Sequence, residues 1–388
     1  MSPISPQLPE AGWIRDHPLR AILTNEFHAR PPEALHPPLR ATYLAMLSGE
    51  AAGPRERAHV ADLCARFDAP LPAPDAAVHS VDLGSFHLKW ERHTEFSAYT
   101  VFRAGCSDGA PFGEPAISAV PADWLAGLAG ERLVGLHIAV FAAGQKEPDP
   151  VSLTEAFGVT AFAGAEMAGG LARAWTDFRT QADGWGRMVL YDAGMSDRQT
   201  GRMVQRLAEI ETYRMLALLA LPLARSVLPR IGRVEASVAA AAERMTGGSS
   251  LSDDQALLAE LSGLAAETAR IATEIGYRFA AARAYHTLVH QRIVDLRESR
   301  IEGLQTFAEF VGRRLDPALA TCQAVETRKE SLETRIARAG TLLRTRVDVA
   351  LEEQNANLLR SMNRRATLQL RLQETVEGLS AVAISYYS

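Results

Sequence analysis

Three side chains with acid–base or anion-binding chemistry alternate in a proline-rich arm, residues 1–40, at the start of the chain. Glu26 and His28 are residue types that act as general acids and bases, and Arg30 can hold an anionic group. The same side chains also suit a structural role, in which Glu26 and Arg30 pin the arm to the rest of the protein. Two hypotheses therefore stay open here, an enzyme that uses the arm and an arm that is only anchored.

Two histidines have the spacing of metal ligands. His286 and His290 are four residues apart in a segment predicted to be helical, so they share one helix face. The residues between them lack the Glu of the HExxH protease motif. A packed or surface histidine pair is the alternative to a metal site.

Carboxylates recur along the helix predicted after this pair. Asp316, Glu326, Glu330 and Glu333 could place oxygen ligands for a divalent cation, although a solvated helix face explains them equally. The glycine-rich segment 164–170 lacks the spacing of known phosphate-binding loops and is predicted to be a loop. We therefore expect no cofactor other than, at most, a divalent cation.

Composition narrows the class of protein. A length of 388 residues fits two domains, and 47% hydrophobic with 22% charged residues is ordinary for a folded chain. A net charge of −5 gives no general attraction to nucleic acid, so no nucleic-acid partner is expected. Cys64, Cys106 and Cys322 are too widely spaced for a structural zinc site or a disulfide framework, which favours a reducing compartment.

We expect an α+β fold, in which an N-terminal mixed or antiparallel sheet with helices on one side precedes a long all-helical C-terminal half. In the first part, helices are predicted at residues 20–27, 39–47, 54–67 and 121–128. Strands are predicted at residues 78–92, 95–103, 133–142, 159–163, 172–181 and 185–191. Two hairpins are expected, one after the first strand and one around the turn dipeptide Asp183-Gly184.

Four regions follow from this pattern. They are an arm with helices packed on the head (1–77), an α/β head (78–192), a helical bundle (196–316) and a long stalk helix (318–388). The head and the helical half should separate near residues 192–197, because strand-type sequence ends there and Ser196 is a good N-cap. A kink or break is expected near Pro222 and Pro229, and another break at Pro317.

An apolar stripe marks the stalk helix. Its members step by fours and sevens, and they are Leu332, Ile336, Leu343, Val347, Leu351, Leu358 and Met362. Such a narrow stripe is typical of a coiled coil, which predicts a homo-oligomer, but an intrachain bundle needs the same stripe.

The last residues resemble the approach to a membrane. Four arginines and no acid lie between Gln354 and Gln373, and two tyrosines follow an apolar turn. These membrane-proximal residues are Arg360, Arg364, Arg365, Arg371, Tyr386 and Tyr387. No stretch reaches the roughly 20 apolar residues of a span, so we expect membrane segments beyond residue 388, with an apolar tail that packs on the protein as the alternative.

Three motifs carry a family resemblance. They are Thr24 to Pro31 (TNEFHARP), Glu211 to Arg214 (ETYR), and Arg360 to Arg365 (RSMNRR) together with Thr375 to Ser380 (TVEGLS). Over nearly its whole length the chain resembles the bacterial DUF3422 family of predicted membrane-anchored proteins. The resemblance implies C-terminal transmembrane helices and implies no activity.

A weaker, architectural resemblance links the order of elements to CorA-type divalent-cation transporters. The leading hypothesis is the cytoplasmic part of a membrane-anchored bacterial protein, the regulatory head and stalk of a CorA-like transporter. A non-enzymatic membrane-anchored adaptor and an enzyme that uses the arm are the alternatives. We expect the bacterial inner membrane as location, with residues 1–388 in the cytoplasm and no signal peptide at the N-terminus.

Overall fold

A computed structural model describes residues 15–27, 30–106, 110–247 and 250–386. Inside helices, it leaves out the side chains of Ile22, Asn25, Glu26 and residues 377–386. The chain divides into two compact units, which are described separately. The head unit comprises residues 1–218 and 282–317, and the helical unit comprises residues 219–281 and 318–388.

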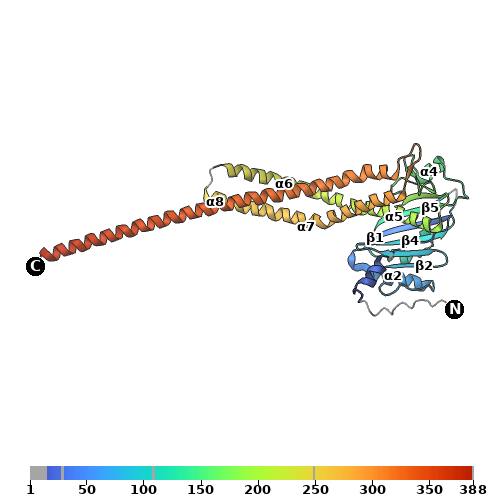
Figure 1. The fold of residues 1–388 in the computed structure, drawn as a ribbon, viewed down its shortest axis with the longest axis horizontal. Helices are drawn as coiled ribbons and strands as arrows, with labels where there is room; N and C mark the ends of the chain where they lie inside the picture. The colour runs from blue at the N-terminus through green and yellow to red at the C-terminus, as the bar shows by residue number, and fades with distance from the viewer. Residues whose placement is uncertain (1–14, 28–29, 107–109, 248–249, 387–388) are drawn as a thin grey trace, which may run out of the picture. The chain divides into compact units, whose positions relative to one another are not determined.

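A single mixed sheet forms the centre of the head unit (Figure 1). Its nine strands among the described residues are β1 (Leu39–Leu47), β2 (Val78–Asp82), β3 (His87–Arg92), β4 (Phe96–Ala104), β5 (Glu131–Phe141), β6 (Ala163–Met167), β7 (Ala172–Thr176), β8 (Gly186–Asp192) and β9 (Ser299–Arg300). They are ordered β2-β3-β4-β1-β5-β8-β7-β6-β9, and of these neighbours β5 and β8 pair in parallel. The predicted α+β class with a mixed sheet is confirmed.

Helices precede, interrupt and follow the sheet. In the described part of the chain they are α1 (Arg20–Phe27), α2 (Gly53–Arg66), α3 (Ala122–Ala126), α4 (Pro150–Phe157), α5 (Asp197–Leu218), α6 (Ala220–Thr246), α7 (Leu251–Leu296) and α8 (Phe307–Tyr386). The helices predicted at residues 20–27, 54–67 and 121–128 are confirmed as α1, α2 and α3, and the expected long helices of the C-terminal half are confirmed as well.

The predicted helix over residues 39–47 is wrong, because this segment is strand β1. It pairs along its whole length with β4 on one side and is hydrogen-bonded to β5 on the other. Seven of its nine positions are buried, so its apolar residues form a continuous run without alternation. Periodicity does not distinguish such a fully buried strand from a buried helix.

Local turn chemistry determines the hairpins. The strand predicted over residues 78–92 is in fact two strands, β2 and β3, joined by a turn in which Gly84 has a φ of 78° and donates its N–H to Asp82 Oδ1 at 2.9 Å. The predicted hairpins are confirmed as β3–β4 and β7–β8. In the second, Asp183 Oδ1 accepts the Trp185 N–H at 3.0 Å.

The predicted loop over residues 164–170 is wrong in its first half, because β6 continues to Met167. The strand predicted at 159–163 begins only at Ala163. Gly164 is required within β6 since an added Cβ would lie 2.4 Å from the Trp175 ring on the neighbouring strand.

Helices cover both faces of the sheet, not one face as predicted. Along β3, Leu88 and Trp90 belong to the apolar cluster that α2 and α3 cover, whereas Lys89 and Glu91 point to the opposite face. Helix α5 lies on that opposite face, where Thr212 donates a hydrogen bond to the Tyr43 hydroxyl at 2.9 Å.

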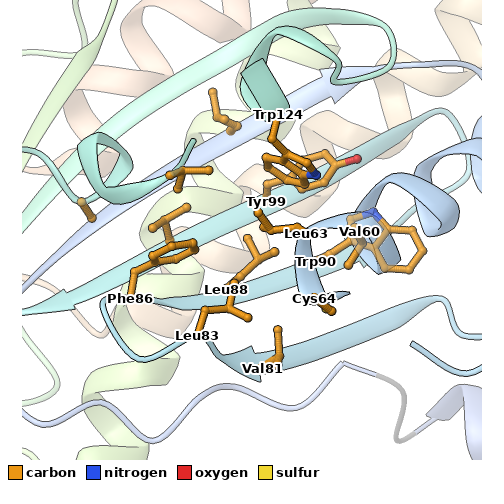
Figure 2. Close-up of a cluster of buried hydrophobic side chains, with 14 of the residues drawn as sticks. Val60, Leu63, Cys64, Val81, Leu83, Phe86, Leu88, Trp90, Tyr99 and Trp124 are labelled. Carbon is orange, nitrogen blue, oxygen red and sulfur yellow. The ribbon is translucent and has the colours of Figure 1, made fainter. Parts of the chain in front are cut away.

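The larger apolar cluster lies between the sheet and α2 (Figure 2). Leu63 of α2, Leu88 and Trp90 of β3 and Tyr99 of β4 are all at most 1% exposed. Trp124 of α3 closes the cluster, since its indole N–H donates to the backbone oxygen of His59 at 2.8 Å. Burying each of these large side chains stabilises the fold by about 1.5–3 kcal/mol, which identifies this cluster as the core of the head unit.

The expectation that strands end near residue 191 is wrong. Strand β9 pairs with β6, and residues 197–218 and 282–317 belong to the same compact unit as the sheet. The predicted all-helical region 196–316 is also interrupted, because the chain leaves α7 at Leu296 and starts α8 at Phe307. Distant pairing of this kind has no local sequence signal.

Side-chain caps explain why α8 starts where it does. Thr306 and Glu309 form a capping box, with Oγ1 of Thr306 accepting the Glu309 N–H at 3.3 Å. The Glu298 carboxylate accepts two further N–H groups of the first turn, each at 2.9 Å. The break predicted at Pro317 is wrong, since Pro317 lies inside α8. The break expected near Pro222 is found at Leu219, between α5 and α6.

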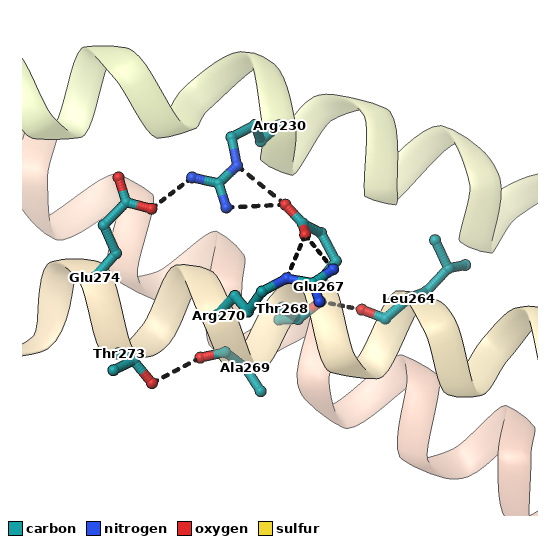
Figure 3. Close-up of polar contacts among 8 residues, drawn as sticks. All are labelled: Arg230, Leu264, Glu267, Thr268, Ala269, Arg270, Thr273 and Glu274. Atoms are coloured by element: carbon teal, nitrogen blue, oxygen red, sulfur yellow. Dashed lines mark hydrogen bonds and ion pairs between the residues drawn. The ribbon is translucent and has the colours of Figure 1, made fainter.

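Three helices pack side by side in the helical unit (Figure 1), namely α6, the first part of α7 and α8. Arg230 of α6 bridges Glu267 and Glu274 of α7 at 2.9 and 2.5 Å (Figure 3). Of the predicted stripe, Leu332, Ile336, Leu343 and Val347 are buried, so the intrachain bundle accounts for this part. The rest of the stripe, Leu351, Leu358 and Met362, is exposed.

By length and composition, one helical stretch in the described part of the chain is apolar enough to cross a membrane. It covers Asp197–Thr246 and reaches a mean hydropathy of 1.4, contrary to the expectation that no such stretch exists. This value refers to an 18-residue window within the stretch, and 33% of that window is buried inside the protein. Core helices of soluble proteins can have the same length and composition, so the stretch alone does not identify a span.

We predict that Gly201→Ala destabilises the head unit. An added Cβ would lie 1.7 Å from the backbone oxygen of Glu33, so either α5 or the arm must move. The expected loss is about 3 kcal/mol of unfolding free energy, measured by urea denaturation. Gly276→Ala in α7 is the matched control: its Cβ meets nothing within 4 Å, so it should stabilise by up to about 1 kcal/mol. Equal effects of the two variants would contradict this packing.

Candidate functional site

The arm reaches a small cavity on the α5 face of the sheet, lined by both charged and apolar side chains. Arg30 lines this cavity and donates a hydrogen bond to the backbone oxygen of Arg92 at 3.0 Å. The Leu35 N–H donates to the oxygen of Asp197 at 3.0 Å, so residues 30–35 pack on the head, as predicted. His28 and the Glu26 side chain lie outside the described residues.

Apolar side chains do not anchor the described part of the arm to the head. Leu19, Leu23 and Phe27 are 47, 61 and 86% exposed. Backbone hydrogen bonds and the Arg30 side chain hold the arm instead.

A buried ion pair lies at the centre of the cavity. Lys89 Nζ lies 2.9 Å from Glu91 Oε1, and both side chains are less than 10% exposed. The Lys89 ammonium also donates to the backbone oxygen of Pro31 at 2.8 Å. Helix α5 contributes Glu209, which forms an ion pair with Arg292 of α7. Charges from the arm, the sheet and two helices therefore meet in one small volume.

Burial governs the protonation of these groups. It raises the pKa of Glu91, against the opposing attraction of Lys89. It lowers the pKa of His93 to about 3, helped by the positive charges of Arg30, Arg92 and Lys89. It also raises the pKa of Tyr213 to about 12. His93 and Tyr213 therefore stay neutral at physiological pH.

The cavity is too small to hold a typical substrate. Its volume is about 40 Å³, room for a few water molecules, whereas ligand sites usually measure about 300–1,000 Å³. Perturbed pKa values mark candidate active sites, but a substrate also needs space beside them. The cavity therefore fits a polar structural junction better than a catalytic site that uses Arg30.

A second cluster brings together three metal-ligand types. Both His286 and His290 on α7 direct Nε2 toward Asp316 Oδ1 on α8, at 2.9 and 3.1 Å. The two Nε2 atoms are 3.1 Å apart. The pKa of Asp316 is lowered, because hydrogen bonds from the histidines outweigh its partial burial. The histidine pair was recognisable from its spacing, whereas its junction with Asp316 required the fold.

The other predicted carboxylates lie elsewhere. Glu326, Glu330 and Glu333 belong to the helical unit, and Glu333 forms an ion pair with Lys329 at 3.2 Å. Glu330 is exposed. Among the described residues, the group of three metal-ligand types that converges is His286, His290 and Asp316.

A serine, a histidine and a glutamate also meet without any sequence signal. Ser80 Oγ lies 2.7 Å from both His87 Nε2 and Glu33 Oε1. In a catalytic triad the acid binds the ring nitrogen that faces away from the serine. Here Glu33 contacts the serine and the same Nε2, at 3.6 Å, so the three groups form a closed triangle and not a relay.

A surface cleft of ligand size, about 390 Å³, lies beside α4 and was also missed. Phe112, Lys146 and Glu147 line it, and the Arg187 guanidinium packs 5.3 Å from the Phe112 ring centroid. These residues come from two separate loops and strand β8, which no local motif connects.

The fold and these clusters define a two-unit α+β protein, a mixed-sheet head joined to a unit of long helices. The family model described as "Protein of unknown function (DUF3422)" matches residues 15–388, so the chain belongs to the DUF3422 family. No curated protein and no solved structure matches the chain. These comparisons confirm the predicted family and give no support to the resemblance to CorA-type transporters.

We predict that His93 makes the head unit acid-sensitive. Its pKa is about 3 when folded and 6.5 when exposed, so below pH 6.5 the unfolded chain binds a proton that the folded chain does not. Stability is therefore lost as the pH falls from about 6.5 toward 3. Between pH 7 and 5 the loss from this one group is about 2 kcal/mol.

The measurement is urea denaturation of the protein and of His93→Gln at both pH values. The variant should lose about 2 kcal/mol less than the parent between pH 7 and 5. His17→Gln, at an exposed position, is the control and should follow the parent. An unchanged pH dependence in His93→Gln would show that His93 is protonated in the folded state.

Proposed function

We propose that this protein is a membrane-attached accessory protein of the bacterial inner membrane, with a cytoplasmic head that binds partners and a long helix that contacts the bilayer. The observation that carries the proposal is the second part of α8. From Leu351 to Val376 its residues are exposed apart from the half-buried Ala356. The end of α6 packs beside α8 at Arg346, which donates to the Met245 oxygen at 2.9 Å.

This exposed part of α8, residues 351–376, is amphipathic. At about 100° per residue, Arg360, Arg364 and Arg371 fall within about 40° of one another on the helix. Leu358 and Met362 lie on the opposite side and are both 60% exposed. Apolar residues opposite a basic face are the pattern of helices that bind membrane surfaces.

Energies support a bilayer as the occupant of this surface. Covering an exposed Leu or Met side chain stabilises by about 1.5–3 kcal/mol. Each arginine near an anionic leaflet adds about 1 kcal/mol, whereas moving one to the bilayer centre costs about 2.5–3.5 kcal/mol. The arginines therefore keep residues 351–376 on the cytoplasmic side, where anionic lipid attracts them.

Two other functions are less well supported. A CorA-like regulatory head and stalk would need divalent-cation flux through membrane segments, and no comparison points to that family. An enzyme that uses the arm lacks substrate space beside Arg30. A homo-oligomer through the exposed stripe is an alternative occupant of the same surface and is an outcome of the experiment below.

We predict that the protein sediments with vesicles that contain anionic phosphatidylglycerol and far less with neutral phosphatidylcholine vesicles. The triple variant Arg360→Gln, Arg364→Gln and Arg371→Gln should lose about 3 kcal/mol of binding, a factor of about 100. The matched control replaces Arg335, Arg338 and Arg344, three exposed arginines earlier in α8, and should bind like the parent.

Three results would contradict the proposal: equal binding to both vesicle types, equal losses in the two triple variants, or no sedimentation with a chain that elutes as a stable oligomer. In cells, fractionation of the complete gene product with an N-terminal reporter should place it in the inner membrane, with the reporter in the cytoplasm.

A further inference from the structure

We propose that His286, His290 and Asp316 bind one Zn²⁺ ion that clasps α7 to α8 within the head unit. This inference is independent of membrane attachment, because it rests on residues of the head unit alone. The three ligand atoms lie within 4.8 Å of one another, and their nearest separations are 2.9 to 3.1 Å.

These separations fit a shared cation. Zinc bonds to imidazole nitrogen and carboxylate oxygen are about 2.0–2.1 Å, so two ligands of a tetrahedral site stand about 3.3 Å apart. The observed separations differ from this value by a few tenths of an ångström, which a small side-chain rotation provides.

Hydrogen bonds alone do not satisfy all three ligand atoms of His286, His290 and Asp316. If both Nε2 atoms carry hydrogen, both can donate to Asp316, but the two donor nitrogens then lie only 3.1 Å apart. If one Nε2 lacks hydrogen, its lone pair faces the carboxylate oxygen at 2.9 or 3.1 Å. Each arrangement leaves one contact repulsive, whereas a cation attracts all three atoms.

Rigid helices hold the ligands in place. On α7, the neighbouring Tyr285 donates to Glu95 Oε1 at 2.7 Å, and Val289 is fully buried between the two histidines. On α8, Leu315 beside Asp316 is 1% exposed. Buried neighbours on both helices fix the two turns that carry the ligands, so the site is preorganised.

The ligand set selects the metal. Two imidazoles favour Zn²⁺ and its transition-metal neighbours, whereas Mg²⁺ and Ca²⁺ prefer all-oxygen sites. Three protein ligands leave a fourth position for water. The side chains of His290 and Asp316 are 46 and 51% exposed, so the ion can enter from solvent and exchange.

The test uses the full chain after removal of metal with a chelator. Titration with ZnCl₂ against a chromogenic competitor should give one tight site per chain, and CoCl₂ should give the visible absorption of four-coordinate cobalt. His286→Gln, His290→Gln and Asp316→Asn should each weaken Zn²⁺ binding by about tenfold or more. Asp75→Asn, at an exposed position with the same loss of charge, is the control.

A second readout separates binding from misfolding. Zn²⁺ should raise the Tm of the parent and of Asp75→Asn but not of the three ligand variants, whose metal-free Tm values should match the parent. MgCl₂ should have no effect in either assay. Undiminished Zn²⁺ binding in His286→Gln and His290→Gln, or no Zn²⁺ binding by the parent, would overturn the site.

Discussion

The buried ion pair between Lys89 and Glu91 constrains how the head unit closes. Each charge costs several kcal/mol to bury unless other groups compensate it, so an apolar helix cannot cover this face of β3 alone. The arm supplies a backbone oxygen from Pro31 to the lysine, and α5 closes the same cavity with Glu209, whose charge is paired with Arg292. Helix α5 also approaches the arm closely, since a Cβ added at Gly201 would lie 1.7 Å from the backbone oxygen of Glu33. On the other face of β3, Leu88 and Trp90 pack in the apolar cluster to which α2 contributes.

Features that depend on neighbouring residues could be predicted from the sequence. The turn at Asp183-Gly184, the helix α1 and the hairpin between β3 and β4 all follow from residues within one element or one turn. Strand β1 could not be distinguished from a helix, because burial on both faces removes the alternation that identifies a strand. The parallel pairing of β5 with β8 and the addition of β9 to the sheet depend on contacts between residues far apart, for which local patterns hold no information.

The same division applies to the sites. The spacing of His286 and His290 was informative because both ligands lie on one helix, whereas Asp316 joins them only because α8 starts at Phe307 and passes beside α7. The capping box at Thr306 and the carboxylate of Glu298 determine that start. Arg30 could be selected by its chemistry, but the ion pair beside it comes from a strand almost 60 residues later in the chain. Its predicted role as an anchor agrees with its hydrogen bond to the Arg92 backbone.

The exposed part of α8 could be covered by a second copy of the helix or by a bilayer. The seven-residue spacing of its apolar stripe distinguishes between the two. Where the stripe packs inside the helical unit, apolar residues such as Leu343 and Val347 continue it, and they are buried. The positions seven residues after Leu358 and Met362 hold Arg365 and Gln369 instead. A second copy of the helix would have to bury these polar groups in a coiled-coil seam, at a cost in stability. At a bilayer surface the arginine side chain can extend toward the headgroups while its apolar neighbours stay covered, so a membrane accommodates this sequence better than a coiled coil does.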